Sequence, residues 1–108
     1  PSLVGEWQYV KAEYYEAGKL VEVDDEAYDW SLQFREDGTG YGHESGEGNE
    51  MYWIYQDDIL YWNEYPIGDL DEAVSFNVKL LNAKQLHLMW EDLNMEYSEV
   101  YIFRKIKR

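Results

Sequence analysis

A strict alternation of large apolar and polar side chains constrains this chain more than any other feature of its sequence. In residues 29–35, Trp30, Leu32 and Phe34 fall on one face of an extended segment, and polar side chains fall on the other. A strand has this period of two, whereas a helix places apolar residues three or four positions apart. The alternation recurs along most of the chain, so the sequence predicts an all-β protein whose strands bury one face.

Eight strands with short connections are expected from this pattern. They cover residues 3–14, 29–35, 39–44, 50–56, 59–63, 74–80, 86–90 and 97–106. Asp37-Gly38 and Asp57-Asp58 are turn signals, and a short extended piece at 20–23 lies in the loop after the first strand. Residues 12–20 are a candidate for a helix, and Gly18 argues against more than one turn of it.

Closure of the sheet into a barrel would pair the edge strands and bury the aromatic face. An open sheet would leave two unpaired edges, and one aromatic face would be exposed to water. A chain of 108 residues has room for one domain and one core. We therefore expect residues 1–108 to form a single domain, an antiparallel up-and-down barrel of eight strands.

The charge of the chain excludes several classes of partner. Nine Lys and Arg residues against 23 Asp and Glu residues give a formal net charge of −14, which repels phosphate backbones and anionic bilayers. We therefore expect no nucleic-acid binding, and no apolar run reaches the ~20 residues of a membrane-spanning helix. The basic residues Arg104, Lys105, Lys107 and Arg108 gather in one short segment.

Catalytic and metal-binding patterns are missing from the sequence. It has no cysteine, no phosphate-binding glycine loop and no dinucleotide fingerprint. The carboxylate runs at 24–26, 57–58 and 69–72 match no EF-hand loop and are interpreted as solvated turn charges. His43 and His87 are the two histidines; His87 is expected to be exposed, and the pair predicts no zinc site. We expect a protein that is not an enzyme and that carries no metal or cofactor.

A resemblance to a known family rests on three sequence features. Gly5-Glu6-Trp7 is a Gly-x-Trp at the head of the first strand, Arg104 lies on the last strand, and residues 32–40 read Leu-Gln-Phe-Arg-Glu-Asp-Gly-Thr-Gly. Together they resemble small bacterial lipocalin-like domains, many of which are exported lipoproteins of gut Bacteroidetes. The resemblance implies a lipocalin-like barrel in which Trp7 plugs the closed end and Arg104 packs across its ring. The chain departs from typical lipocalins because it is shorter, lacks their disulfide and shows no C-terminal helix, which argues against a roomy cavity.

The alternation also predicts a highly aromatic interior. The rings expected to face inward are Trp7, Tyr9, Trp30, Phe34, Tyr41, Trp53, Tyr55, Tyr61, Phe76, Trp90, Tyr101 and Phe103. An eight-stranded barrel is just wide enough to be filled by side chains or to hold one small ligand, and the sequence leaves both alternatives open. Tyr41, Tyr55 and Tyr61 lie near the glycine-rich hairpins and are expected at the open end. The candidate ligand-binding residues are Trp30, Phe34, Tyr41, Tyr55, Tyr61, Phe76 and Trp90.

Two hypotheses of different classes follow. The first is a non-enzymatic binding protein that takes a small hydrophobic or aromatic ligand at the open end of the barrel. The alternative is a filled barrel that acts as an interaction or structural domain through its outer surface. It is motivated by residues 97–106, in which Tyr101 and Phe103 lie on one face while Val100 and Ile102 make the other face apolar too. It is also motivated by four tyrosines that are expected to be exposed, Tyr14, Tyr15, Tyr52 and Tyr65. Under this alternative, the last strand contacts a second subunit.

A carbohydrate contact through exposed Trp and Tyr side chains also fits the composition, but no motif supports it.

An extracytoplasmic location is implied by the resemblance alone. It predicts a protein of the periplasm, or an outer-membrane lipoprotein whose lipid anchor lies upstream of this chain. The chain itself begins Pro1-Ser2-Leu3-Val4 and shows no signal peptide, which does not decide between cytoplasm and export.

Overall fold

The computed structural model describes residues 2–106 and consists almost entirely of strands. The strands are β1 (Gly5–Glu16), β2 (Lys19–Asp24), β3 (Trp30–Phe34), β4 (Thr39–Glu44), β5 (Glu47–Gln56), β6 (Ile59–Asn63), β7 (Val74–Leu81), β8 (Gln85–Asp92) and β9 (Tyr97–Ile106). One turn of 3-10 helix, η1 (Leu70–Glu72), lies between β6 and β7, and no described helix is long and apolar enough to cross a membrane. The all-β prediction is confirmed, and residues 12–20 belong to β1, its turn and β2 rather than to a helix.

The strands form one antiparallel sheet that closes on itself. Its order is β2-β1-β3-β4-β5-β6-β7-β8-β9, and β9 also pairs with β1. Eight strands make the closed ring, and β2 is an additional strand beside the second half of β1. The expected up-and-down barrel is therefore confirmed. The extended piece at 20–23, which the sequence analysis placed in a loop, is part of the sheet.

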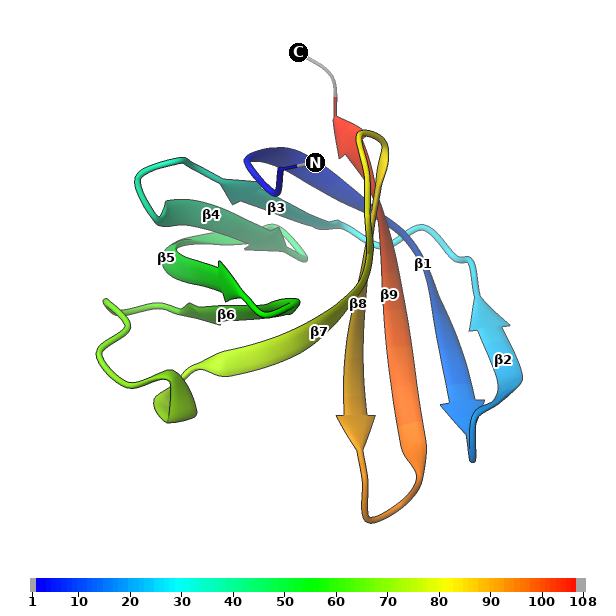
Figure 1. Cartoon of the computed structure of the whole chain (residues 1–108). Helices are drawn as coiled ribbons and strands as arrows, with labels where there is room; N and C mark the ends of the chain where they lie inside the picture. The colour runs from blue at the N-terminus through cyan, green and yellow to red at the C-terminus, as the bar shows by residue number, and fades with distance from the viewer. Residues whose placement is uncertain (1, 107–108) are drawn as a thin grey trace.

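Strand β1 pairs with two different strands along one of its edges. Residues 5–8 pair with β3 and residues 12–16 pair with β2, while the register against β9 on the other edge shifts between Tyr9 and Lys11. A bulge of this kind bends a strand and increases its twist. Figure 1 shows the consequence: β8, β9, β1 and β2 run side by side, β3 to β6 cross them steeply, and β7 joins the two groups.

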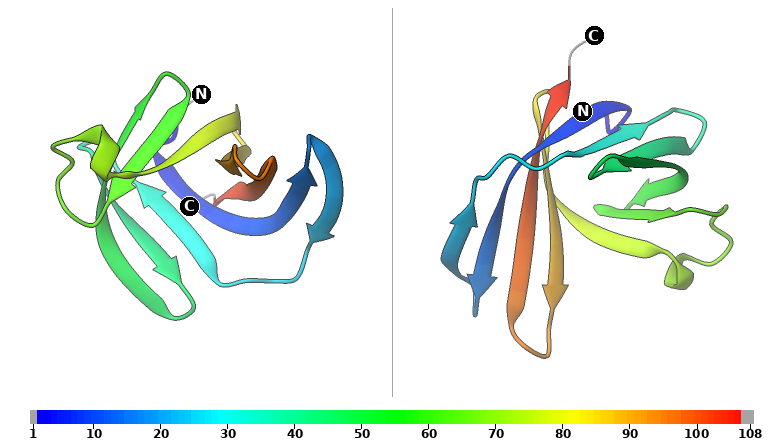
Figure 2. Two further views of the ribbon diagram at one scale, coloured as in Figure 1. Left: turned by 90° about the horizontal axis from the view of Figure 1, so that it is seen from below. Right: turned by 180° about the vertical axis from the view of Figure 1, so that it is seen from behind.

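The turns divide the barrel into two ends. The β3–β4, β5–β6 and β7–β8 turns lie at one end with the segment that precedes β1, and the β1–β2, β2–β3, β4–β5, β6–β7 and β8–β9 connections lie at the other. We call the first the closed end and the second the open end. At the open end the β1–β2 and β8–β9 hairpins reach beyond the other strands, as the view from behind in Figure 2 shows. The backbone N–H of Ala17 donates to Glu96 O at 2.8 Å and joins these two hairpins.

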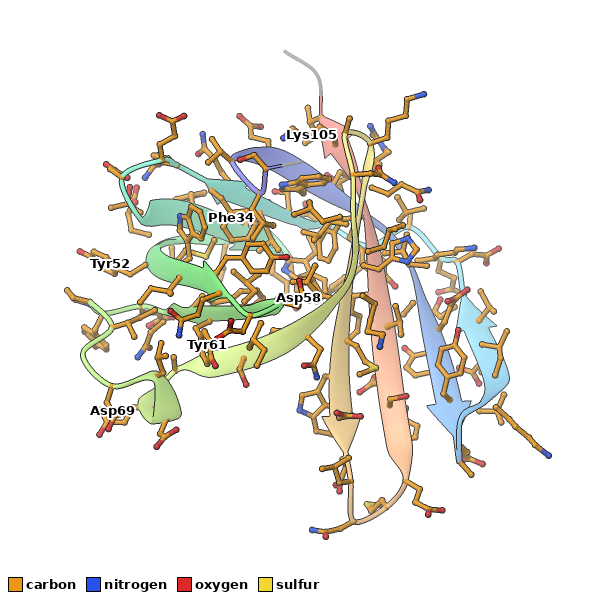
Figure 3. The ribbon with its side chains drawn as sticks, viewed as in Figure 1. Phe34, Tyr52, Asp58, Tyr61, Asp69 and Lys105 are labelled. Carbon is orange, nitrogen blue, oxygen red and sulfur yellow. The ribbon has the colours of Figure 1, made fainter. Side chains whose placement is uncertain are left out.

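Trp7 fills the closed end. Its side chain is fully buried, and its indole N–H donates to Leu3 O at 2.9 Å. Lys105 Nζ lies 4.5 Å from the centroid of the indole ring and donates to Val4 O at 2.6 Å. Figure 3 labels Lys105 at this end of β9. Because an ammonium is attracted to the face of an indole, Lys105 holds the segment before β1 against the Trp7 ring.

Arg104, the expected partner of Trp7, does not lie over its ring. Phe103 faces the interior and is fully buried, so the two-residue period of β9 turns Arg104 outward and Lys105 inward. Arg104 is exposed. Trp7 occupies the predicted place, but the cation that covers it comes from the next position along the strand. The remaining basic residues of this segment, Lys107 and Arg108, lie outside the described residues.

The interior is solid from the closed end to the middle of the barrel. It is packed by the buried residues Leu3, Trp7, Leu32, Phe34, Met51, Leu60, Leu86, Leu88 and Phe103. Trp53 packs edge-on against Phe34 with 5.3 Å between ring centroids. Its indole N–H is shared between Arg35 O at 3.1 Å and Thr39 O at 2.9 Å. Burial of each large apolar side chain contributes roughly 1.5–3 kcal/mol, so this half of the barrel supplies the core that stabilises the fold.

The outer face of β9 is covered as well. Val100 and Ile102 point away from the interior, yet they are only 8% and 6% exposed. His87, which pairs with Ile102, is half-buried rather than exposed as expected, and this burial lowers its pKa. The strand that is apolar on both faces is thus covered by side chains of its own chain.

Removal of the Lys105 ammonium should destabilise the protein. Lys105→Met keeps the aliphatic stem but loses the hydrogen bond to Val4 O and the contact with Trp7. Hydrogen bonds of charged groups contribute ~1.5–3 kcal/mol and exposed cation–π contacts about 0.5–1 kcal/mol. We expect the free energy of unfolding to fall by ~1–3 kcal/mol, measured by urea unfolding with Trp fluorescence. Arg104→Met is the matched control and should change this free energy by less than ~0.5 kcal/mol. Equal losses in the two variants would contradict the assignment.

Candidate ligand site at the open end of the barrel

On the β4 side of the barrel, the inward-facing side chains are small or polar toward the open end. On β4 the inward-facing residues are Gly40, Gly42 and Glu44, because each pairs with an inward-facing residue of β3. A Cβ atom at Gly42 would make only ordinary contacts, at 3.9 Å from Leu32 Cδ2 and from Met51 Sδ. This glycine therefore leaves space that a larger side chain would occupy.

Two adjoining hollows open at this end. The first, about 440 Å³, lies against β3, β4, β5 and β6, and the second, about 400 Å³, lies against β1, β3, β9 and the β2–β3 loop. Trp30 and Glu44 line both hollows. We call the two hollows together the mouth.

Aromatic rings form the floor of the mouth. The centroid of the Trp30 ring lies 5.7 Å from that of Tyr9 and 5.4 Å from that of Tyr101. On the other side, Trp62 stacks on Phe76 at 4.8 Å. Phe76 in turn meets Tyr101 edge-on at 6.2 Å. Since offset and edge-on contacts are the favoured geometries of aromatic pairs, these rings form one continuous cluster beneath both hollows.

The end of the β2–β3 loop is bonded to β4 and the β4–β5 turn, next to the last pair of the β3–β4 ladder. The backbone N–H of Ser45 donates to Asp29 O at 2.8 Å, and His43 Nδ1 lies 3.2 Å from Asp29 Oδ1. The hydroxyl of Tyr28 donates to the carboxylate of Glu44. These contacts fix the loop beside β4, so that Tyr28 lines the second hollow and Glu44 lines both.

Carboxylates surround the rings. The acidic residues of the lining are Asp24, Glu26, Glu44, Glu47, Glu50 and Glu64, and no Lys or Arg among residues 2–106 lines the mouth. Burial, and then the nearby Asp24 carboxylate, raise the pKa of Tyr9 to about 12. Burial and Glu99 likewise raise the pKa of Tyr101. Both phenols therefore stay protonated further into the alkaline range than an exposed tyrosine and keep their capacity to donate a hydrogen bond there.

The candidate ligand-binding residues divide among several places. Trp30 and Phe76 line the mouth. Phe34 faces inward but belongs to the solid core, where it is 1% exposed. Trp90 faces inward on β8 beyond the mouth, where it is 41% exposed and its ring meets that of Tyr97 edge-on.

The three tyrosines expected at the open end lie elsewhere. Tyr41 is on the outer face of β4, and its ring covers Gly48. Tyr61 is on the outer face of β6. Tyr55 faces inward, but it lies at the closed end, where its hydroxyl donates to Asp58 at 3.3 Å. The prediction is wrong because closeness to a flexible hairpin in the sequence determines neither the face nor the end of the barrel that a ring occupies.

Sequence reasoning missed Tyr28 and Trp62, and it interpreted the carboxylates at 24–26 as solvated turn charges. The alternation within 59–63 could have identified Trp62, because Leu60 on the same face is fully buried. Tyr28 lies in a loop, to which no periodic pattern applies. Asp24 lines the mouth because β2 continues the sheet beside β1, and that strand was not expected.

The side chains of the mouth are of kinds that can bind a ligand. Flat rings can stack on a ligand, the phenols can donate hydrogen bonds, and the carboxylates can accept them and attract positive charge. Among residues 2–106, no three His, Asp or Glu side chains converge on a point where they could hold a metal ion.

Comparison with known proteins supports the fold. No protein-family model matches the sequence, and no curated protein does. The chain is similar to the crystal structure of an uncharacterized protein from Bacteroides eggerthii DSM 20697, with a TM-score of 0.68 over 97% of this chain and 100% of that chain. The sequence identity is 20%, so the similarity shows the barrel fold alone.

The free energy of unfolding at alkaline pH should depend on the shielded phenol of Tyr9. Since its pKa in the folded protein is raised, the linked stability is fully present below the ordinary value of 10.0 and is lost as the pH rises to about 12. Tyr9→Phe has no phenol to ionise, so its free energy of unfolding should decline less over this range than that of the wild type. Urea unfolding at several pH values measures the difference. Tyr65→Phe, at a loop position that is 72% exposed, should decline as the wild type does. An unchanged decline in Tyr9→Phe would argue against a shielded phenol.

Proposed function

We propose that this chain is a non-enzymatic binding protein that takes a small hydrophobic or aromatic ligand at the open end of its barrel. The observation that carries the proposal is the mouth, with hollows of about 440 and 400 Å³ over a floor of aromatic rings. Ligand sites are concave clefts of ~300–1,000 Å³, mostly apolar with a few polar groups. The size of the mouth and its aromatic floor agree with this description, and its lining carries more charged groups than such sites usually do.

The distribution of bulky side chains along the barrel supports a site at this end. Trp7, Phe34 and Trp53 pack the closed half, whereas Gly42 and Asn49 face inward near the opening. The filled core and the hollow, which the sequence left as alternatives, thus occupy different halves of one barrel. The space that remains suits one small ligand, in keeping with the narrow interior of an eight-stranded barrel.

The alternative function, through the outer surface, has less support. It was motivated in part by Val100 and Ile102, which are almost fully covered by their own chain. Of the four tyrosines that also motivated it, Tyr14, Tyr15 and Tyr52 are half-buried and Tyr65 is exposed. The most exposed apolar side chains are Tyr65 in the β6–β7 loop and Leu93 and Met95 in the β8–β9 turn. Leu20, Val21 and Val23 on the edge strand β2 are also exposed. Scattered exposed apolar residues are common in monomeric proteins and do not by themselves indicate a partner.

We also propose that the protein works outside the cytoplasm and belongs to a lipocalin-like lineage. Trp7 at the closed end with a cation over its ring agrees with the resemblance, and the similar crystal structure is of a Bacteroides protein. Both arguments are analogies of fold rather than of site. Immunoblotting of cytoplasmic, periplasmic and membrane fractions tests the location, and recovery in the cytoplasm alone would overturn it.

A substitution that fills the hollow should block binding. Gly42→Val directs a branched side chain inward between Leu32 and Met51, where the glycine now leaves space. We expect the wild-type protein to bind a neutral hydrophobic fluorophore such as Nile red with a micromolar Kd, and Gly42→Val to weaken this binding at least about tenfold. Titration of the dye fluorescence measures both affinities.

Gly68→Val is the matched control for this substitution. No atom lies within 4 Å of a Cβ built at Gly68, which is in the β6–β7 loop and does not line the mouth. Its affinity for the dye should equal that of the wild type, and circular dichroism verifies that both variants keep the β-structure. Absence of binding by the wild type, or equal weakening in both variants, would count against a site in the mouth.

A further inference from the structure

We propose that the mouth selects an organic cation, meaning an amine or quaternary ammonium group carried by an aromatic or apolar body. This inference rests on the proposed function, because it names the chemical class of the ligand for the same site. It is drawn from an aromatic floor beneath a rim of carboxylates, to which no Lys or Arg of residues 2–106 contributes.

The carboxylates reach the rings from several elements. Asp24 ends β2 and Glu26 lies in the loop that follows, while Glu44 ends β4 and Glu47 begins β5. Glu44 lines both hollows, as Trp30 does. A ligand group above Trp30 is therefore exposed to negative charge from both sides of the mouth.

Most of this charge has no basic partner in the described part of the chain. Its ion pairs are Arg35 with Glu50 at 2.9 Å and His43 with Asp29 at 3.2 Å. Glu50 is the one lining carboxylate in these pairs, and Asp24, Glu26, Glu44 and Glu47 take part in neither. Carboxylates gathered around a concave, partly apolar surface repel one another and focus a negative potential on it, and a bound cation relieves that repulsion.

No Lys or Arg of residues 2–106 lines the mouth, and Arg35 alone is paired with one of its carboxylates, Glu50. The acidic residues at the closed end, by contrast, have several basic residues near them. Lys84, Arg104 and Lys105 are at the closed end, and Lys105 is already engaged with Trp7. Lys19 is at the open end but is exposed at the start of β2 and does not line the hollows. Such a distribution steers cations toward the mouth and repels carboxylates and phosphates from it.

The rings suit both parts of such a ligand. The planes of Tyr9 and Tyr28 are inclined by 87° and those of Trp30 and Tyr101 by 75°, so their faces are turned in different directions. The face of an aromatic ring attracts a cation, and quaternary ammonium groups are recognised by several rings arranged around them. The apolar body of the ligand gains by burial against the same rings.

Three ligands that share one aromatic body test the charge preference directly. They are 1-naphthylmethyl-trimethylammonium, 1-naphthylmethanol and 1-naphthylacetate, measured by isothermal titration calorimetry with the wild-type protein. We expect the ammonium to bind at least about tenfold more tightly than the alcohol, and the carboxylate to bind most weakly. Added salt should weaken binding of the ammonium and leave that of the alcohol unchanged, because salt screens charges that solvent can reach.

Two double variants with the same change in net charge localise the effect. Asp24→Asn with Glu44→Gln removes charge from the mouth, and we expect it to lose most of the preference for the ammonium over the alcohol. Glu36→Gln with Asp57→Asn removes the same charge from turns at the closed end and should keep the wild-type preference. Binding of the neutral alcohol reports that each variant is folded with an intact floor.

The outcomes separate this inference from the proposed function. If the alcohol binds as tightly as the ammonium, the cation preference is overturned while the binding site remains. If none of the three ligands binds, the proposed function fails and the inference fails with it. An equal loss of preference in both double variants would also overturn the inference, because overall charge rather than the mouth would then be responsible.

Discussion

The narrow interior of a closed eight-stranded barrel is the constraint on which the rest of this structure depends. Once β9 pairs with β1, the interior has room for large side chains or for one small ligand at a given level, but not for both. Trp7, Phe34 and Phe103 use that room in the closed half. Gly42, facing inward on β4, leaves it free near the opening. The order of large and small residues along the strands therefore decides where a ligand fits.

The alternation of apolar and polar side chains was sufficient to predict the barrel, because each strand has one face that must be buried. It was insufficient for Tyr61, whose strand carries apolar side chains on both faces. The cation over Trp7 was predictable in principle, since the correct inward assignment of Phe103 places Lys105 and not Arg104 on the same face; the family resemblance pointed to the wrong neighbour. The role of Asp24 could not be read from the sequence, because it depends on β2 forming a hairpin with the second half of β1, a strand that the pattern did not predict.

The distribution of the net charge of −14 in the structure is more informative than its total. As a total it only excludes polyanionic partners. In the structure, carboxylates from β2, β4 and β5 gather around aromatic rings, while Lys84 and Lys105 lie at the opposite end. Grouped like charges destabilise a compact state, so this arrangement has a cost that a function at the mouth would explain. Active and binding sites commonly carry such unfavourable features.

The five tryptophans provide the most direct test, because they lie at different depths of one barrel. The indole N–H groups of Trp7 and Trp53 are hydrogen-bonded in the closed half, whereas Trp30 and Trp62 line the mouth. Indole signals in ¹H–¹⁵N correlation spectra should be followed while 1-naphthylmethyl-trimethylammonium is added. The signals of Trp30 and Trp62 should shift and saturate while those of Trp7 and Trp53 remain in place. Saturable binding that leaves Trp30 and Trp62 unmoved, or that shifts the closed-end indoles instead, would contradict a ligand site at the open end.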